Sequence, residues 1–156
     1  MTTKKVAILM GSKSDAETMQ AASDMLTRFD VEHEVWAMSA HRNAETVREF
    51  VGSARDNGFG VIIAAAGMAA HLAGACAAHT TLPVIGVPTS NSKLDGLDAL
   101  YSTVQMPPGM PVATVAIDGA ANAGLLAVQI LSIDDDVLVK KLAEYRATWK
   151  PERLDK

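Results

Sequence analysis

Five short apolar runs, separated by segments with helical spacing, are the sequence feature that most restricts the fold. They cover residues 6–10, 35–38, 61–66, 83–87 and 112–117. Continuous apolar runs of this length are typical of strands buried on both faces of a sheet. Parallel strands need crossover connections of about a dozen residues or more, and the segments between these runs are long enough. The runs therefore predict an α/β protein whose parallel sheet carries helices on both faces.

The intervening segments carry apolar residues at helical spacing. The clearest stripes are Met19, Ala22, Leu26 and Phe29 in the first segment and Val47, Phe50, Val51 and Ala54 in the second. The second helix is expected to end at Asn57-Gly58, a good C-terminal signal. Residues 89–111 are rich in Ser, Asn, Asp, Gly and Pro, so we expect mainly loop there, with a helix over 97–104.

Two helices near the C-terminus carry more apolar surface than one small domain is expected to bury. The predicted helix over residues 120–131 is apolar nearly all round, and a last helix, about 135–149, has one apolar stripe. Residues 64–78 are rich in alanine, which favours close approach of neighbouring elements. Together these segments favour a homo-oligomer.

Length and strand order complete the predicted architecture. A chain of 156 residues fits a single domain over residues 1–156. We expect a flavodoxin-like three-layer α/β/α sandwich with strand order 2-1-3-4-5. In that order the loops that start at Gly11, Ser39 and Gly67 follow neighbouring strands, so they should converge on one crevice.

Composition argues against several classes of protein. No stretch of about 18 apolar residues is present, so no membrane span or membrane partner is expected. The N-terminus lacks a signal-peptide pattern, which favours the cytoplasm. A net charge of −4 without a basic stripe argues against nucleic acid as a partner. The single cysteine, Cys76, is interpreted as a small buried thiol and not as a nucleophile.

The tetrapeptide Ser39-Ala40-His41-Arg42 is the most informative short motif. It follows the second apolar run, and ligands of open α/β sheets bind at the carboxyl ends of strands. Arginine holds phosphate or carboxylate through two parallel hydrogen bonds, and histidine exchanges a proton near neutral pH. The motif therefore indicates an anion anchor beside a proton shuttle. The alternative is a polar loop capped by Asn43.

The loop Gly11-Ser12-Lys13-Ser14-Asp15 lies where the first helix begins, so its backbone N–H groups could receive a phosphate. It matches neither the Walker loop nor the dinucleotide fingerprint, which disfavours ATP and NAD. Ser14 and Glu17 match a capping box. Ser12 and Asp15 are then left to bind a ligand, and Asp15 could accept hydrogen bonds from sugar hydroxyls.

The four histidines fall into two pairs. His33 opens a predicted strand and His79 closes a predicted helix, so both are interpreted as structural. His41 and His71 lie in predicted strand-end loops, although a satisfied, partly buried histidine is an equal alternative for His71. No pair has the spacing of a metal site, so no metal is predicted.

Six spaced blocks resemble one known family. They are Gly11-Ser-Lys-Ser-Asp15, Ser39-Ala-His-Arg42, Ala70-His-Leu72, Pro83-Val-Ile-Gly-Val-Pro88, Leu100-Tyr-Ser-Thr-Val-Gln-Met-Pro107 and Gly119-Ala-Ala-Asn-Ala123. In this order, over nearly the whole chain, they resemble the PurE family of purine biosynthesis. The resemblance implies a flavodoxin-like subunit of a homo-octamer, with active sites at subunit contacts and the C-terminal helix packing on a neighbouring subunit.

The resemblance also implies an activity and a set of site residues. Class I enzymes of the family move a carboxyl group from the exocyclic nitrogen to ring carbon 4 of 5-aminoimidazole ribonucleotide, a small nucleotide, without ATP, metal or organic cofactor. The catalytic residues would be His41, as general acid/base, and His71. The substrate-binding residues would be Ser12, Ser14, Asp15, Ser39, Arg42, Gly67 and Met68.

Two departures and two alternatives accompany the resemblance. Met68 and Ala73 stand where the family usually has glycine and proline, and a methionine at a glycine position limits φ. Class II enzymes, which carboxylate aminoimidazole ribonucleotide directly with carbon dioxide, have Ser-Ala-His-Lys, whereas Arg42 favours class I. The second alternative is a non-catalytic flavodoxin-like nucleotide-binding protein.

Overall fold

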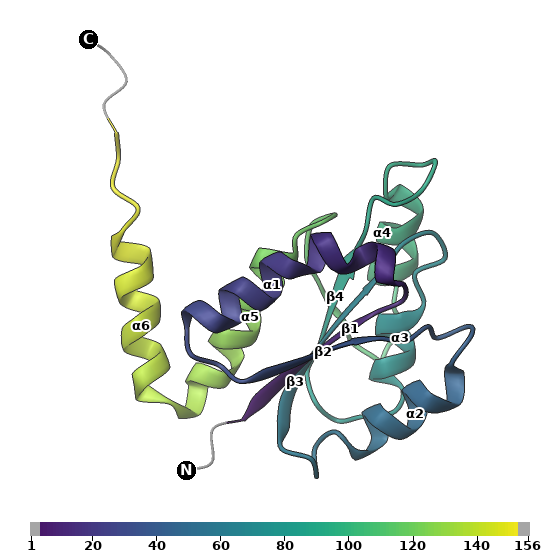
Figure 1. The fold of residues 1–156 in the computed structure, drawn as a ribbon, viewed down its shortest axis with the longest axis horizontal. Helices are drawn as coiled ribbons and strands as arrows, with labels where there is room; N and C mark the ends of the chain where they lie inside the picture. Colours follow the sequence, from purple (N-terminus) through teal and green to yellow (C-terminus); the bar gives the residue numbers. More distant parts are fainter. Residues whose placement is uncertain (1–3, 153–156) are drawn as a thin grey trace.

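One parallel sheet organises the molecule. The computed structural model describes residues 4–152, and its five strands lie in the order β2-β1-β3-β4-β5 with every neighbouring pair parallel (Figure 1). The strands are β1 (Lys5–Met10), β2 (His33–Ala37), β3 (Phe59–Ala66), β4 (Val84–Pro88) and β5 (Ala113–Thr114). The predicted fold class and the predicted strand order are confirmed.

Helices cover both faces of this sheet. On one face lie α1 (Ala16–Arg28) and α5 (Ala120–Leu131), which pack against each other, and α6 (Asp136–Ala147) follows α5 at the edge of the molecule (Figure 1). On the other face lie α2 (Ala44–Ser53), α3 (Leu72–Ala77) and α4 (Leu97–Val104). Within the described residues no helix is both long and apolar enough to cross a membrane.

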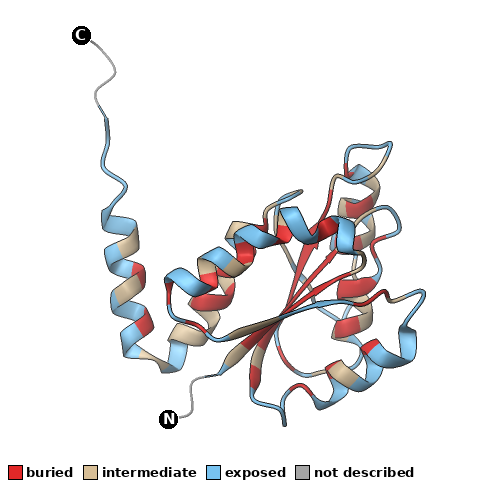
Figure 2. Cartoon of the chain, in the orientation of Figure 1, coloured by how far each residue is buried: buried red, intermediate tan, exposed pale blue. Residues whose placement is uncertain are grey.

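Alternation along β1 shows why the sheet needs cover on both faces. Val6 and Ile8 point into the core under α1 and α5, while Ala7 and Leu9 point into the core under α2 and α3. All four side chains are fully buried, and the centre of the sheet is buried throughout (Figure 2). A strand with apolar residues at odd and even positions alike is therefore buried on both faces, as the middle layer of the fold requires.

The two edge strands differ from the sequence-based prediction. The prediction placed the fifth strand over residues 112–117, but β5 pairs with β4 only at Ala113 and Thr114. The chain then turns toward α5, with Asp118 in the left-handed region (φ 56°) and its N–H donating to the Pro88 carbonyl. The other edge strand, β2, includes His33 and Glu34 ahead of the apolar run over 35–38, ends at Ala37 and is largely exposed.

The starts and ends of two helices also need correction. The capping box of Ser14 and Glu17 was wrong, because a 3-10 turn over Lys13–Asp15 precedes α1 and places Ser14 inside a helical turn. Ser12 caps that turn instead, and its hydroxyl accepts from the Ser14 N–H at 3.3 Å. The second helix ends at Ser53, and separate turns connect it to Gly58.

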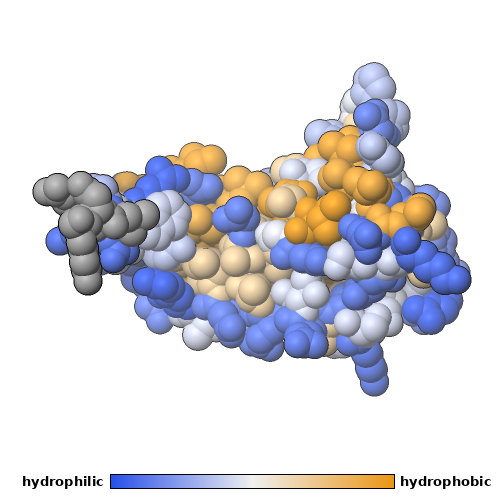
Figure 3. Space-filling model, turned by 90° about the horizontal axis from the view of Figure 1, so that it is seen from above, coloured by the Kyte–Doolittle hydropathy of each residue, from blue (hydrophilic) through white to orange (hydrophobic). Residues whose placement is uncertain are grey.

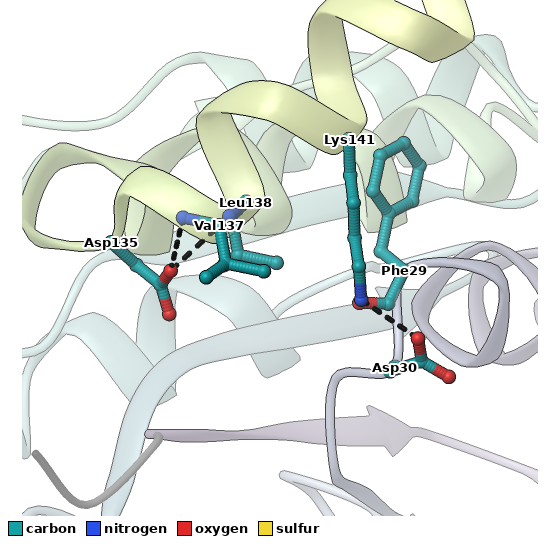
Figure 4. A network of polar contacts seen from close by, with 6 residues as sticks. All are labelled: Phe29, Asp30, Asp135, Val137, Leu138 and Lys141. Atoms are coloured by element: carbon teal, nitrogen blue, oxygen red, sulfur yellow. Dashed lines mark hydrogen bonds and ion pairs between the residues drawn. The ribbon is translucent and has the colours of Figure 1, made fainter.

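The apolar stripe of α6 packs against the core of the same chain. Leu138 and Leu142 are buried in the core that α1 and α5 share. Asp135 caps the helix by accepting from two backbone N–H groups, and Lys141 joins α6 to the end of α1 (Figure 4). The Lys141 ammonium donates to the Phe29 carbonyl at 3.0 Å and to the Asp30 carboxylate at 2.7 Å. Residues 148–152 extend beyond the helix and are exposed.

Two helical glycines provide a test of the packing between α1 and α5. A Cβ at Gly124 would lie 2.9 Å from the Ala22 carbonyl oxygen, whereas at Gly52 the nearest atom is 4.0 Å away. We expect Gly124→Ala to lower the free energy of unfolding by about 1–3 kcal/mol through overpacking. Gly52→Ala, the matched control, should raise it by up to about 1 kcal/mol through helix propensity. Urea unfolding at equal protein concentration measures both, and a more stable Gly124→Ala variant would contradict the packing.

Candidate active site

A cleft of about 420 Å³ lies at the carboxyl ends of β1, β2 and β3. It is lined by all nine residues that the sequence assigned to the site: Ser12, Ser14, Asp15, Ser39, His41, Arg42, Gly67, Met68 and His71. The predicted convergence of the three strand-end loops is therefore confirmed. The cleft volume falls in the range of small-molecule sites, about 300–1,000 Å³.

A second hollow is larger but chemically different. It measures about 930 Å³ and lies between the α5–α6 junction and the amino ends of the strands. Its lining combines the acidic run Asp134 to Asp136 with Leu131 and Pro83, and none of its lining residues within the described part of the chain is a histidine. The smaller cleft, which holds two imidazoles and a guanidinium, is therefore the better candidate for an active site.

The loop after β2 is shaped by Ser39. This residue is 7% exposed, and its hydroxyl oxygen accepts from the N–H groups of His41 at 3.2 Å and Arg42 at 3.3 Å. The Asn43 side chain accepts from the Ser39 N–H at 3.1 Å, so it closes the loop and makes no capping bond to α2. Because the Ser39 oxygen already accepts two bonds, its own O–H is left to donate to a ligand oxygen.

Two histidines from different loops form a pair. The Nε2 of His41, after β2, lies 2.7 Å from the Nδ1 of His71, after β3, and the two rings meet edge to face. A hydrogen bond at this distance needs one N–H donor and one lone pair, so the two nitrogens share a single proton. Both side chains are exposed to the cleft. The pair can therefore pass a proton to or from a bound ligand.

Arg42 reaches across the cleft to the first loop. Its Nη2 donates to the Gly11 carbonyl at 3.1 Å, and the residue is exposed. A guanidinium carries five N–H donors, so this bond leaves most of them for an anion. The side chain of Arg42 thus joins the loops after β1 and β2 and places positive charge beside the Ser12 turn.

The loop after β3 has an unusual backbone. Met68 lies in the left-handed region (φ 56°) and is 63% exposed, although it stands where the PurE pattern has glycine. The Ser102 hydroxyl, from α4, accepts from the Ala70 N–H at 3.0 Å, while its own O–H donates to the Asp98 carbonyl of the same helix at 2.7 Å. The α4 helix therefore holds this loop in place next to His71.

Asp15 is the buried charge of the cleft. Its carboxylate is 3% exposed, and one oxygen, Oδ1, accepts from the Thr89 hydroxyl at 3.0 Å and from the Asn91 amide at 2.9 Å. Both donors follow β4, and sequence reasoning did not assign them to the site. The signal that could have found them is the end of β4 at Pro88, since β4 is the neighbour of β3 in the predicted strand order.

Local contacts explain the places of His33 and Cys76 in the structure. His33 bonds through its two ring nitrogens to the Ser23 hydroxyl at 2.7 Å and the Val31 carbonyl at 3.0 Å, which confirms a structural role. Cys76 is fully buried under the sheet, and burial raises the pKa of its thiol to about 12. A thiol in that environment is not a nucleophile at neutral pH.

Fold and cleft together define a flavodoxin-like α/β protein whose cleft places an exposed arginine beside a pair of hydrogen-bonded histidines. The model of the AIR carboxylase family matches residues 5–152, and the chain belongs to this family. The resemblance to PurE proteins found in the sequence is thereby confirmed.

Three relatives illustrate the similarity. The chain is 53% identical over 146 residues to the N5-carboxyaminoimidazole ribonucleotide mutase of Pyrococcus abyssi, and this match covers 94% of this chain and 84% of that protein. The mutase of the same name from Bacillus subtilis is 53% identical over 152 residues, with 96% and 94% covered. The crystal structure of Treponema denticola PurE superposes with a TM-score of 0.85 at 29% identity, and covers 93% of this chain and 90% of that one.

The raised pKa of Cys76 predicts low thiol reactivity. Because the pKa of the thiol is about 12, only about one molecule in ten thousand carries the thiolate at pH 8. We expect no labelling of the native protein by iodoacetamide within an hour at pH 8, and complete labelling in 6 M guanidinium, measured by mass spectrometry. Rapid labelling of the folded protein would show that the thiol is accessible or ionised.

Proposed function

We propose that this chain is an N5-carboxyaminoimidazole ribonucleotide mutase of de novo purine biosynthesis. It would convert N5-carboxyaminoimidazole ribonucleotide to 4-carboxy-5-aminoimidazole ribonucleotide, an intramolecular transfer of a carboxyl group. The observation that carries the proposal is the 2.7 Å hydrogen bond between His41 and His71 in a cleft that also holds Arg42. The names of the relatives and the family support the same activity.

Each end of such a substrate has suitable partners in the cleft. The phosphate would lie near Arg42, with hydroxyl donors from Ser39, Ser12 and Ser14. The ribose would meet the Asp15 carboxylate, which accepts hydrogen bonds from hydroxyl groups. The imidazole and its carboxyl group would then lie beside the histidine pair, over Gly67 and Met68.

The histidine pair supplies the proton that this reaction needs. Cleavage of the N–C bond of the carbamate releases carbon dioxide, and His41 protonates the amino nitrogen that is left. Carbon 4 of the electron-rich ring then attacks the carbon dioxide, and His41 removes the proton from that carbon. The proton balance over both steps is zero, so one histidine serves as acid and then as base. Confinement keeps carbon dioxide close to the ring between the two steps.

His71 has a separate role in this scheme. Its Nδ1 is hydrogen-bonded to the Nε2 of His41, so it keeps the His41 ring oriented and can take up or return the proton that His41 exchanges with the ligand. The loop that carries His71 is held to α4 by Ser102, so the orientation depends on contacts outside the cleft.

Assembly and location extend the proposal. Exposed apolar side chains lie on and around α4, among them Leu94, Leu97, Tyr101 and Val104, and Figure 3 shows apolar side chains gathered toward that side of the molecule. Exposed Val137, Val139 and Trp149 lie on or beyond α6. Such surface supports self-association. The homo-octamer and the packing of α6 on a neighbouring subunit follow from the family resemblance, and the cytoplasm follows from the N-terminal sequence.

The proposal is tested by incubating the purified, metal-free protein with 4-carboxy-5-aminoimidazole ribonucleotide and following ultraviolet absorbance with and without bicarbonate. Reversible interconversion with the N5-carboxy isomer, unaffected by bicarbonate, is the expected result. Turnover that requires bicarbonate and aminoimidazole ribonucleotide would indicate a direct carboxylase. Binding without turnover would indicate a nucleotide-binding protein.

Replacement of His41 is expected to stop the chemistry and spare the fold. His41→Asn should reduce kcat by at least about a hundredfold, the scale of lost general acid/base catalysis, with substrate affinity retained. His79→Asn, which changes an exposed histidine outside the cleft, is the matched control. Steady-state turnover and calorimetric binding measure the two quantities. Near-normal turnover of His41→Asn would remove the residue from the proposed mechanism.

Replacement of Arg42 is expected to weaken binding. Arg42→Leu removes the guanidinium proposed for the phosphate, so Kd for substrate and product should rise about ten- to a hundredfold, the scale of a lost charge-assisted pair. Arg55→Leu serves as the control, because Arg55 bonds to Thr81 and lines the other hollow. Unchanged affinity of Arg42→Leu would place the phosphate elsewhere.

A further inference from the structure

We propose that Thr89 and Asn91 are positioning residues that hold the Asp15 carboxylate for the hydroxyl groups of the ligand. The inference rests on the proposed function, because it takes Asp15 to meet the ribose. Both residues belong to the segment after β4, separated in sequence from Asp15 by 74 and 76 positions. They connect the loop after β1 with a segment that the three converging loops do not include.

The two bonds divide the carboxylate into a held oxygen and an accessible acceptor. The Thr89 hydroxyl and the Asn91 amide both donate to Oδ1 of Asp15, at 3.0 Å and 2.9 Å. Within residues 4–152 no hydrogen bond is formed to Oδ2. Rotation of the carboxylate would break both bonds at once. Thr89 and Asn91 therefore determine where the second oxygen lies when a ligand hydroxyl arrives.

The backbone of Thr89 is placed by the sheet. Its N–H donates to the Ala66 carbonyl at 3.0 Å, which extends the β3–β4 pairing beyond Pro88, and the residue is fully buried. A Cβ at Gly67 would lie 2.8 Å from the Thr89 hydroxyl oxygen. Glycine at position 67 thus leaves the space through which Thr89 reaches Asp15.

The segment that carries Asn91 is held on both sides. The N–H of Ser90 donates to the Asp118 carboxylate at 3.0 Å, and the hydroxyl of Ser92 donates to the Asp98 carboxylate at 2.8 Å. Asn91 also lines the cleft. Its amide is therefore presented to Asp15 by a backbone that is already fixed before a ligand binds, which is the condition for a preorganised site.

Burial makes these two donors important for binding. A carboxylate on a residue that is 3% exposed has lost most of its hydration, so it needs protein donors in place of water. Hydrogen bonds to charged groups contribute more than bonds between neutral groups, enough for about a tenfold change in affinity when one is lost. The histidine pair lies on other loops, so we expect the effect to fall on binding and to spare kcat.

Substitution of Thr89 is the first test, with 4-carboxy-5-aminoimidazole ribonucleotide as the ligand. Thr89→Val keeps the shape and removes the donor, so Kd should rise about tenfold while kcat changes less than about threefold. Thr89→Ser, which keeps the hydroxyl, should restore the affinity. Thr103→Val is the matched control, because Thr103 is also buried and its hydroxyl donates to the Ala99 carbonyl of its own helix. Affinity of Thr89→Val within twofold of the unmodified protein would overturn the inference.

A double-mutant cycle separates positioning from general structural support. If Thr89 acts through Asp15, then Thr89→Val should add little to Asp15→Asn, whereas independent effects would multiply and contradict the inference. Asn91→Asp gives a second readout if Thr89→Val does not fold. This substitution places two carboxylates together, which raises the pKa of one of them. The variant should therefore bind more weakly than the unmodified protein at pH 8, and this loss of affinity should shrink as pH falls to 5.5. A pH-independent loss would count against the role of Asn91.

The test of Asn91→Asp compares the Kd of the variant with the Kd of the unmodified protein at each pH, because other charged groups face the same region. Arg42, His41 and His71 line the cleft, and Asp98 and Asp118 hold the neighbouring loop. All five are the same in the variant and the unmodified protein. Failure of the proposed function is distinguishable, since the unmodified protein would then not interconvert the two carboxylated ribonucleotides at all.

Discussion

The position of β1 between β2 and β3 is the constraint on which the site depends. Met10 pairs with Ala37 on one side and with Ala65 on the other, so the three strands end at the same level. The pairing continues for one residue beyond them, through bonds from the Met38 N–H to the Met10 carbonyl at 2.8 Å and from the Gly11 N–H to the Ala65 carbonyl at 2.9 Å. Three loops from distant parts of the sequence therefore begin side by side.

The cleft above these strands is held by polar cross-links between loops more than by apolar packing. Arg42 joins the first loop to the second, the histidine pair joins the second to the third, and Asp15 joins the first to the segment after β4. The bond from Arg42 to the Gly11 carbonyl is exposed, so it contributes about 1 kcal/mol or less. A phosphate offers the guanidinium a stronger bidentate partner, and a bound anion can therefore replace this link without disturbing the buried Asp15 contacts.

The fold was largely predictable, because its determinants are local. Continuous apolar runs specify strands that are buried on both faces, and apolar stripes such as Met19, Ala22 and Leu26 specify helices. The boundaries of these elements shift where turns intervene. Ser14 shows such a shift, since a 3-10 turn took the place of the expected cap. The limits of β5 depend on where Asp118 turns the chain, which no periodicity records.

The membership of the cleft was predictable in part, for a related reason. Residues that directly follow β1, β2 and β3 were found, because strand order brings strand ends together, while their proposed roles stay predictions. Thr89 and Asn91 were missed, because they lie in the segment rich in turn residues, where sequence pattern gives no direction for a side chain. Ser102 was missed although it lies in the predicted helix over 97–104, because helical spacing does not show which loop a helix contacts. Their importance arises from tertiary contacts with Asp15 and with the backbone of the loop after β3.

The adjacent positions Gly67 and Met68 are subject to different physical constraints. Position 67 lacks room for a Cβ because the Thr89 hydroxyl lies there, whereas position 68 carries a side chain in a backbone region that costs about 1–2 kcal/mol for an L-residue. The Met68 side chain is mostly exposed, so its own packing does not offset that cost. Ser102 holds the backbone two residues after it by accepting from the Ala70 N–H, and the strained conformation persists because α4 and the sheet determine where the loop runs. Methionine at this point gives the cleft an apolar surface beside the histidine pair that glycine would not supply.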